Sequence, residues 1–410
     1  MEQITKPHCG ARLDRLPDCR WHSSMFAIVA FGLLVCWSNA VGGLILAQLK
    51  ELGWTDNSTT ATFSAITTAG MFLGALVGGI IGDKTGRRNA FILYEAIHIA
   101  SMVVGAFSPN MDFLIACRFV MGVGLGALLV TLFAGFTEYM PGRNRGTWSS
   151  RVSFIGNWSY PLCSLIAMGL TPLISAEWNW RVQLLIPAIL SLIATALAWR
   201  YFPESPRWLE SRGRYQEAEK VMRSIEEGVI RQTGKPLPSV VIADDGKAPQ
   251  AVPYSALLTG VLLKRVILGS CVLIAMNVVQ YTLINWLPTI FMTQGINLKD
   301  SIVLNTMSMF GAPFGIFIAM LVMDKIPRKT MGVGLLILIA VLGYIYSLQT
   351  SMLLITLIGF FLITFVYMYV CYASAVYVPE IWPTEAKLRG SGLANAVGRI
   401  SGIAAPYAVA

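Results

Sequence analysis

The sequence contains eleven apolar runs that are each about as long as a lipid bilayer is thick. A membrane-spanning helix needs roughly 20 predominantly apolar residues to cross a hydrocarbon core of about 30 Å. Only 13% of the residues are charged, whereas soluble domains carry about a quarter. The sequence therefore predicts an all-α polytopic membrane protein and excludes a water-soluble globule. The runs cover residues 24–49, 61–82, 89–107, 113–137, 152–174, 182–201, 265–291, 302–323, 331–347, 352–378 and 391–410.

Basic residues are concentrated on one side of the predicted spans. With the N-terminus in the cytoplasm, 26 Lys and Arg residues fall in cytoplasmic segments and three fall in outer loops. Because positive residues are enriched in the cytoplasmic loops of membrane proteins, we expect a cytoplasmic N-terminus. The short outer loops favour a multi-pass protein of the bacterial inner (plasma) membrane. The net charge of +9 reflects this topology and gives no reason to expect a nucleic-acid partner.

One long polar segment, residues 202–264, separates six of the spans from the other five. It contains Ser205 followed by Pro206, a pair typical of a helix start, and then apolar residues at helical spacing. We therefore expect short amphipathic helices on the cytoplasmic face. The expected parts of the chain are a cytoplasmic tail (1–23), an N-terminal six-helix bundle (24–201), a linker (202–264) and a C-terminal bundle (265–410).

The two halves of the chain repeat one another at a nearly constant spacing. Asp83 and Asp324 are 241 residues apart, Glu138 and Glu380 are 242 apart, and basic residues follow each of them. Because both copies fall on the cytoplasmic side, the repeats are parallel and related by an axis along the membrane normal. The counterpart of Glu204 would fall beyond residue 410, so we expect two six-helix repeats that are truncated in the eleventh span.

Several motifs resemble those of the major facilitator superfamily. The segment GIIGDKTGRR, from Gly79 to Arg88, is similar to the signature of its loop between spans two and three. The segments RFVMGVGLG, ExxPxxxRG and PESPRWL resemble the sugar-porter-related branch, which also carries other metabolites and includes inner-membrane metabolite transport proteins of enterobacteria. The resemblance implies the major facilitator fold, in which two bundles open a central cavity alternately to either side. We expect a monomer without a cofactor.

The same resemblance implies a cytoplasmic latch that holds the two halves together while the outer side is open. Its charged residues fall beside helix ends, where carboxylates and guanidinium groups complement helix dipoles and pair with one another. The alternative is that these solvated charges only fix the topology. The predicted latch residues are Gly79, Asp83, Gly86, Arg87, Arg88, Glu138, Arg145, Glu204, Arg207, Asp324, Arg328, Glu380 and Arg389.

Four ionisable residues, Glu95, His98, Arg118 and Arg399, fall inside the predicted spans, where such residues are costly and usually functional. In proton-coupled sugar porters, as the resemblance implies, an aspartate on span one faces the counterpart of Arg118. Asn39 takes that place here and cannot change its charge, so the protein is a uniporter or couples to protons elsewhere. Glu95 and His98 share one helix face and form the candidate proton site. Alternatively, His98 only bonds a backbone carbonyl.

Polar residues on the central spans are the candidate substrate ligands. Arg118 and Arg399 have no acidic partner on neighbouring central spans, and arginine binds carboxylates through paired hydrogen bonds; the alternative is pairing with backbone carbonyls. The paired glutamines of the sugar porters correspond to Ala275 and Met276, which favours an organic acid or a sugar acid. Each amide could instead bond a neighbouring helix. The predicted substrate-binding residues are Asn39, Arg118, Asn157, Gln280, Tyr281, Asn285, Trp286 and Arg399, and Asn277 and Asn395 are further amides of these spans.

No catalytic or metal motif accompanies these features. The sequence contains no phosphate-binding loop and no Gly-x-Ser-x-Gly motif, and the spacing of His8, Cys9, Cys19 and His22 fits no metal site. We therefore expect a transporter of a small polar metabolite rather than an enzyme or an ATP-driven pump, with protons as a further candidate partner. The alternatives are a neutral-sugar uniporter, a sugar/proton symporter and, from another class, a non-transporting nutrient receptor.

Overall fold

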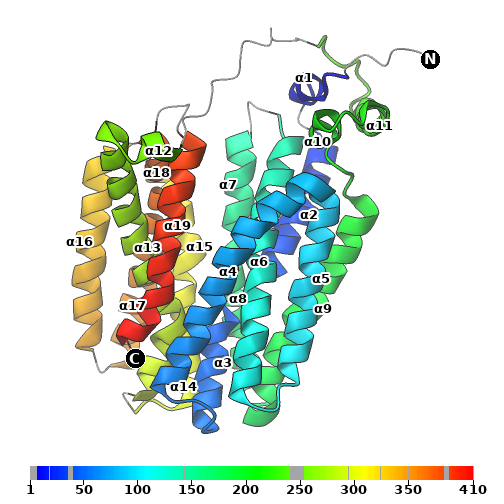
Figure 1. Cartoon of the computed structure of the whole chain (residues 1–410). Coiled ribbons are helices and arrows are strands. Elements are labelled where there is room, and N and C mark those ends of the chain that lie inside the picture. The colour runs from blue at the N-terminus through cyan, green and yellow to red at the C-terminus, as the bar shows by residue number, and fades with distance from the viewer. Residues whose placement is uncertain are drawn as a thin grey trace.

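The computed structural model describes residues 7–17, 19–35, 40–141, 145–240, 254–293, 295–323, 325–349, 351–382 and 387–409. All regular secondary structure in these ranges is helical. Figure 1 shows two helical bundles side by side, with the small helices of the linker and of the N-terminal segment at one end. We call this end the linker face and the other end the opposite face.

The N-terminal bundle begins at Arg20, before the expected start at residue 24. Two expected spans are divided, because 24–49 corresponds to two helices and 152–174 is interrupted by a turn at Asn157 and Trp158. The side chain of Asn157 donates to the Ser153 carbonyl at 2.7 Å, a local bond that competes with the helical ladder. The helices are α2 (Arg20–Val35), α3 (Val41–Glu51), α4 (Asn57–Thr85), α5 (Arg87–Ala106), α6 (Met111–Tyr139), α7 (Arg145–Gly156), α8 (Ser159–Leu170) and α9 (Ala176–Tyr201).

The C-terminal bundle contains one π-helix, η1, which continues a long apolar helix. Its elements are α13 (Gly260–Thr293), α14 (Leu298–Met309), α15 (Gly311–Val322), α16 (Arg328–Ser347), α17 (Met352–Cys371), η1 (Tyr372–Tyr377), α18 (Val378–Glu380) and α19 (Lys387–Val409). The linker face carries α1 (Cys9–Asp14), α10 (Pro206–Ser211), α11 (Tyr215–Thr233) and α12 (Tyr254–Leu257).

Eight helical stretches within the described ranges are long and apolar enough to cross a membrane. They comprise α4, α5, α6 and α9 in one bundle and α13, α14 with α15, α16, and α17 through α18 in the other. The other three expected spans correspond to the interrupted pairs α2/α3 and α7/α8 and to α19. The predicted all-α polytopic membrane protein is confirmed.

The two bundles repeat the same close helix packing. A Cβ atom at Gly74 of α4 would lie 2.0 Å from the Val123 carbonyl oxygen of α6. A Cβ atom at Gly315 of α15 would lie 2.2 Å from the Thr364 carbonyl oxygen of α17. Both residues of the second pair are 241 positions after their counterparts. Glycine at these positions lets the helix backbones touch, so the predicted repeat extends to backbone packing.

The bundles meet toward the opposite face. There α3 packs against α13 and α14, α8 packs against α14, and α4 crosses α19. Leu298 and Ile302 of α14 share an apolar cluster with Leu44 of α3. Asn305 donates a hydrogen bond to the Ser164 hydroxyl at 3.2 Å. The two bundles are therefore closed against each other at this face.

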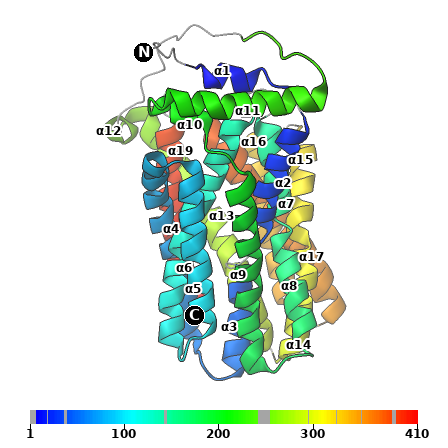
Figure 2. The ribbon, with the colours of Figure 1, turned by 90° about the vertical axis from the view of Figure 1, so that its right-hand side faces the viewer.

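The linker helices α10 and α11 lie across the end of the N-terminal bundle, with α1 beside α11 (Figure 2). The predicted helix start is confirmed, because Ser205 accepts a hydrogen bond from the Trp208 amide at 3.2 Å and Pro206 takes the first helical position. The apolar side of α11, including Met222, packs with Leu13 of α1 in one buried cluster. Part of the predicted N-terminal tail is thus a helix docked on the linker.

Candidate functional site

A cavity of about 320 Å³ lies between the bundles, near the middle of the spanning helices. This volume falls in the range of small-molecule sites, about 300–1,000 Å³. The cavity brings together four of the predicted substrate-binding residues, which come from both bundles: Asn157, Gln280, Tyr281 and Arg399. The further amides Asn277 and Asn395 also line it.

Three cavity asparagines share one hydrogen-bonding arrangement. The side-chain nitrogens of Asn157, Asn277 and Asn395 each donate to the carbonyl four residues earlier, at 2.7, 2.8 and 2.9 Å. Each bond fixes the amide against its own helix and leaves the amide oxygen free to accept from another group. The cavity therefore offers fixed acceptors for hydroxyl groups.

Arg399 supplies the positive charge of the cavity lining. The side chain is half-buried on α19. Within the described residues, no hydrogen bond or ion pair joins its guanidinium to another group, and no Asp or Glu lines the cavity. A guanidinium in this setting can donate two parallel hydrogen bonds to a carboxylate. The cavity thus combines an anion-binding group with hydroxyl acceptors.

Ser153 and Tyr160 also line the cavity, and neither was among the predicted ligands. Ser153 lies one helical turn before Asn157, and Tyr160 lies three residues after it, so helical spacing from Asn157 was the available signal. The ring of Tyr160 also lies 5.4 Å from the ring of Tyr367 on α17, measured between centroids. Tyr160 therefore connects the two bundles beside the cavity.

Arg118 is not among the residues that line the central cavity. Its side chain is 1% exposed, and its guanidinium carbon lies 4.7 Å from the centroid of the Phe63 ring. Its Nε donates to the Thr67 hydroxyl at 3.2 Å. Phe63 and Thr67 of α4 lie against the guanidinium, so a role of Arg118 in binding the substrate stays a prediction. Asn39 and the side chains of Asn285 and Trp286 lie outside the described residues.

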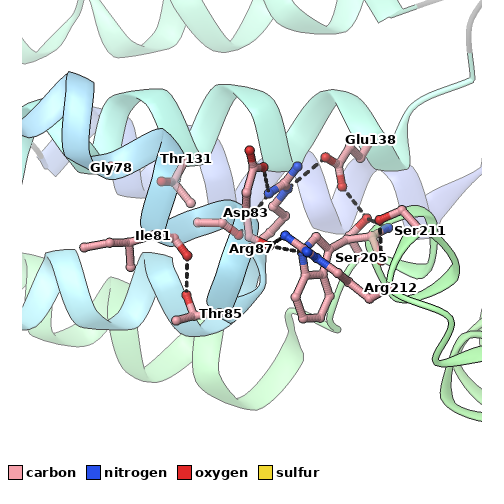
Figure 3. A network of polar contacts seen from close by, with 12 residues as sticks. Gly78, Ile81, Asp83, Thr85, Arg87, Thr131, Glu138, Ser205, Ser211 and Arg212 are labelled. Carbon is pink, nitrogen blue, oxygen red and sulfur yellow. Dashed lines mark hydrogen bonds and ion pairs between the residues drawn. The ribbon is translucent and has the colours of Figure 1, made fainter.

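The predicted latch residues of the N-terminal bundle form one network at the linker face. Arg87 Nε donates to Glu138 Oε1 at 2.8 Å, and Arg87 Nη1 donates to Asp83 Oδ1 at 2.7 Å (Figure 3). The Ser205 hydroxyl donates to the other carboxylate oxygen of Glu138. Arg207 Nε donates to the Glu138 backbone carbonyl at 3.0 Å. The network ties α4, α5, α6 and α10 together within this bundle.

Glu204 binds the N-terminal end of α5. Its Oε1 accepts hydrogen bonds from the backbone amides of Arg87 and Arg88 at 2.7 and 3.3 Å, where a carboxylate complements the helix dipole. Gly86 precedes these amides with φ +99°, and a Cβ atom there would lie 2.3 Å from Glu204 Oε2. Both the backbone conformation and the position of Glu204 therefore require glycine at residue 86. A Cβ atom at Gly79 would meet nothing within 4 Å.

The C-terminal bundle repeats the central ion pair. Arg328 Nε donates to Glu380 Oε2 at 2.9 Å, and its Nη2 donates to Oε1 at 3.1 Å. Arg328 Nη1 also donates to the Met323 carbonyl. In the N-terminal bundle, Arg87 Nη1 makes the equivalent bond to the Gly82 carbonyl at 2.9 Å. The internal repeat therefore extends to the hydrogen bonds of the arginine.

The side chains of three predicted latch residues lie outside the part of the chain that the structure describes. Asp324 lies outside the described residues, and Arg145 and Arg389 are described only as residues of α7 and α19. Arg88 Nη2 donates to the Trp199 carbonyl of α9 at 2.6 Å. The ion pairs that join two described latch residues each lie inside one bundle, and Arg207 pairs with Asp14 of α1 at 3.0 Å. A latch between the bundles remains a prediction.

Glu95 and His98 lie together inside the N-terminal bundle. Both side chains are fully buried on α5, with Glu95 Oε2 3.6 Å from His98 Nδ1. Neither carboxylate oxygen has a hydrogen-bond partner in the described part of the chain. Gly124 of α6 packs against the His98 backbone, and its neighbour Leu125 lines the central cavity. The pair is a buried ionisable site separated from that cavity by α6.

Comparison with known proteins identifies the family. The sequence profile of the Major Facilitator Superfamily matches residues 26–406. The chain belongs to the Major Facilitator Superfamily. It is 44% identical to the inner membrane metabolite transport protein YdjE of Escherichia coli, over 100% of this chain and 90% of that protein. It is 24% identical to the niacin transporter NiaP of Acinetobacter baylyi, over 97% of this chain and 89% of that protein.

The fold also matches a solved structure of this superfamily. The xylose transporter XylE of Escherichia coli, in a partially occluded inward-open conformation, superposes with a TM-score of 0.72 at 17% identity, over 95% of this chain and 91% of that chain. The predicted major facilitator fold is confirmed. The chain is a Major Facilitator Superfamily transporter of small polar metabolites in a membrane, and its relatives are transporters rather than enzymes.

Proposed function

We propose that the chain carries a small hydroxylated organic anion, such as a sugar acid, through the central cavity by alternating access. The proposal rests on Arg399, which lines the cavity without a partner among the described residues while no carboxylate lines the same space. A substrate carboxylate would bind this guanidinium bidentately. Substrate hydroxyls would donate to the oxygens of Asn157, Asn277 and Asn395.

The proposed substrate carries a carboxylate and hydroxyl groups, and the names of two similar proteins support these two features. NiaP is named a niacin transporter, and niacin carries a carboxylate. XylE is named a xylose transporter, and xylose carries several hydroxyl groups. A sugar acid combines both groups in one molecule. A neutral-sugar uniporter is the competing function, and it would leave Arg399 without a role in binding.

The proposed cycle follows from where the bundles meet. They are closed at the opposite face by α3, α8 and α14, so we assign the open side to the linker face and place that face in the cytoplasm of the bacterial inner membrane. When the linker face closes, the networks around Arg87 and Arg328 would approach one another and act as the latch. Each monomer contains the complete cavity on this account.

Proton coupling is the second candidate function, and the buried pair on α5 favours it. Buried ionisable groups inside a membrane are costly and usually functional, and the Glu95 carboxylate has no other partner among the described residues. The charged residues of α4, α6 and α9 lie near the helix ends, apart from Arg118, which is enclosed by α4. We infer that Glu95 and His98 hold the coupling proton, in place of the carboxylate absent at Asn39.

Uptake into proteoliposomes tests the substrate class. The purified chain is reconstituted, and uptake of radiolabelled gluconate, nicotinate and D-glucose is compared with empty vesicles. We expect saturable uptake of at least one acid that unlabelled acid inhibits. Uptake of glucose alone would replace the proposal with the neutral-sugar uniporter, and absence of flux with retained binding would favour the non-transporting receptor.

A further inference from the structure

A second cavity, of about 360 Å³, lies at the opposite face between the two bundles. Its walls are the end of α3, the connection between α8 and α9, and the start of α14. Because α14 belongs to the C-terminal bundle, both bundles contribute to this outer cavity. It is therefore complete only while the bundles are closed at this face. Its volume lies near the lower end of the range for small-molecule sites, about 300–1,000 Å³.

Gln48 marks the floor of the outer cavity. It lines the cavity from α3, its side chain is fully buried, and neither Nε2 nor Oε1 has a hydrogen-bond partner in the described part of the chain. The surrounding residues of α3, from Val41 to Leu49, are buried as well. A buried primary amide with both groups unpaired is energetically costly. Such an amide calls for a partner that enters from the cavity.

The other polar groups of the wall are already paired. Asn179 Nδ2 donates to Thr171 Oγ1 at 3.4 Å, and its Oδ1 accepts from Gln183 Nε2 at 2.8 Å. Asn297 caps the start of α14, where its Oδ1 accepts from the Asp300 amide at 2.8 Å. These bonds fix the shape of the wall. They leave the Gln48 amide as the group available for recognition among the described residues.

The charge of the outer cavity differs from that of the central cavity. Glu51 and Lys299, one from each bundle, are exposed at the rim and balance each other. Glu51 lies one helical turn from Gln48 on α3, so the two charged residues of the lining cancel in sign. A planar amide presents a donor and an acceptor side by side, which match two adjacent hydroxyl groups. The lining therefore suits a neutral molecule with a vicinal diol, because Glu51 offsets Lys299 here, whereas no carboxylate offsets Arg399 in the central cavity.

We propose that the outer cavity is a second binding site for a neutral polyhydroxylated solute of monosaccharide size, held by the Gln48 amide. The site is distinct from the transport site. A ligand bound there bridges the bundles and stabilises the state that is closed at the opposite face. External ligand should therefore slow uptake of the transported anion without competing for the central cavity.

Binding to the full-length purified chain tests this site with D-glucose as the probe. Thermal unfolding and isothermal titration are measured for the wild type, for Gln48→Leu and for the matched central variant Gln280→Leu. We expect D-glucose to raise the Tm of the wild type and of Gln280→Leu. We expect Gln48→Leu to bind it at least about tenfold more weakly, as loss of a bidentate polar contact predicts.

Two outcomes would overturn the proposal. One is loss of D-glucose binding in Gln280→Leu with retention in Gln48→Leu, which would place the sugar in the central cavity. The other is absence of D-glucose binding to the wild type at concentrations up to about 100 mM. In that case the outer cavity would hold only water. If Gln48→Leu does not fold, Gln48→Met, which keeps the shape of the side chain but not its amide, replaces it, and unchanged affinity in that folded variant would equally overturn the proposal.

Uptake kinetics separate this inference from the proposed function. External D-glucose should lower the maximal rate of acid uptake while the KM for the acid stays constant, and Gln48→Leu should abolish this inhibition. Acid uptake without any effect of glucose would remove the outer site and leave the transport proposal intact. If the chain binds glucose through Gln48 but transports no acid, the outer site stands and the transport proposal fails.

Discussion

Arg328 donates a hydrogen bond to Glu380 across 2.9 Å at the linker end of the C-terminal bundle. Arg87 makes the same bond to Glu138 across 2.8 Å in the N-terminal bundle. Both arginines also donate to a carbonyl at the end of the preceding transmembrane segment. The chain therefore carries two copies of one charged network at one membrane face, and each copy is held within its own bundle.

Removing a charge from one network should slow the transport cycle. Glu138→Gln weakens the bonds from Arg87 and Ser205, so the closed linker face loses part of its latch. We expect transport to fall by about tenfold or more, the effect of one charge-assisted hydrogen bond, while substrate affinity is retained. Reconstituted uptake and equilibrium binding measure the two quantities. Glu217→Gln, in an exposed pair with Arg214, is the control and should transport normally.

Two glycines of the same signature should respond differently to alanine. In Gly86→Ala the new Cβ meets the Glu204 carboxylate and the backbone stays at φ +99°, so we expect a loss of about 2 kcal/mol or more in stability. In Gly79→Ala the Cβ meets open space, and the Tm should remain unchanged. Thermal unfolding of both purified variants checks this contrast. Equal Tm values would contradict the assigned role of Glu204.

The charge of Arg399 should decide acid transport. Arg399→Gln removes the charge-assisted bonds to the substrate carboxylate, and we expect uptake of the acid to fall by about 10- to 100-fold. Arg399→Lys keeps the charge but loses the paired geometry, so its uptake should be intermediate. Asn395→Ala, one helical turn earlier, should weaken binding less. An Arg399→Gln variant with wild-type affinity for the acid would refute the proposed binding mode.

Proton coupling should depend on the buried pair of α5. Glu95→Gln keeps the shape of the side chain but cannot exchange a proton, so accumulation driven by an inward proton gradient should disappear while downhill exchange continues. His98→Gln should act in the same way. Ser101→Ala is the control, because its hydroxyl bonds the His98 carbonyl and holds no titratable proton. Gradient-driven accumulation that survives in Glu95→Gln would show that protons couple elsewhere or not at all.

Docking of α1 on α11 should be lost in acid. Burial acts to raise the pKa of Glu226, but hydrogen bonds and positive charge from Arg12 and Arg15 outweigh it and lower this pKa below its usual value. A lowered pKa adds stability above the unfolded value, about 4.3, and this contribution is lost as the pH falls through the folded value. The hydrogen-exchange protection of α1, measured relative to the intrinsic rate at each pH, should therefore fall below about pH 4.3.

Arg12, which pairs with Glu226, provides the matched test at neutral pH. Arg12→Ala should accelerate exchange in α1 at pH 7, because it leaves two carboxylates, Glu219 and Glu226, without their shared partner. Arg214→Ala, which breaks an exposed pair on the same linker, should leave exchange in α1 unchanged. Equal protection of α1 in both variants would show that the apolar contacts alone hold it.

The fold could be predicted from sequence because the membrane imposes it. Apolar runs of bilayer length and the bias of Lys and Arg are properties of each segment alone. The spacing of 241 residues likewise identified Arg87 and Arg328 as equivalents before their hydrogen bonds were known. The capping of α10 by Ser205 was also predictable, since a helix start depends on neighbouring residues.

The parts that could not be predicted depend on contacts between distant segments. Arg118 is enclosed by Phe63 and Thr67, and nothing local to residue 118 indicates which helix its side chain will meet. The docking of α1 joins residues about 210 positions apart, such as Arg12 and Glu226. The unpaired amide of Gln48 becomes visible only when both bundles enclose it.

The central claim is that the cavity between the bundles binds the transported anion and opens to one membrane face at a time. It is tested most directly by thiol labelling of Ser153→Cys, a cavity residue, in a chain whose seven native cysteines are replaced by alanine. We predict that an impermeant reagent labels this position from the linker face and that a transported acid protects it. Labelling that no acid slows, or absence of labelling from both faces, would contradict the account.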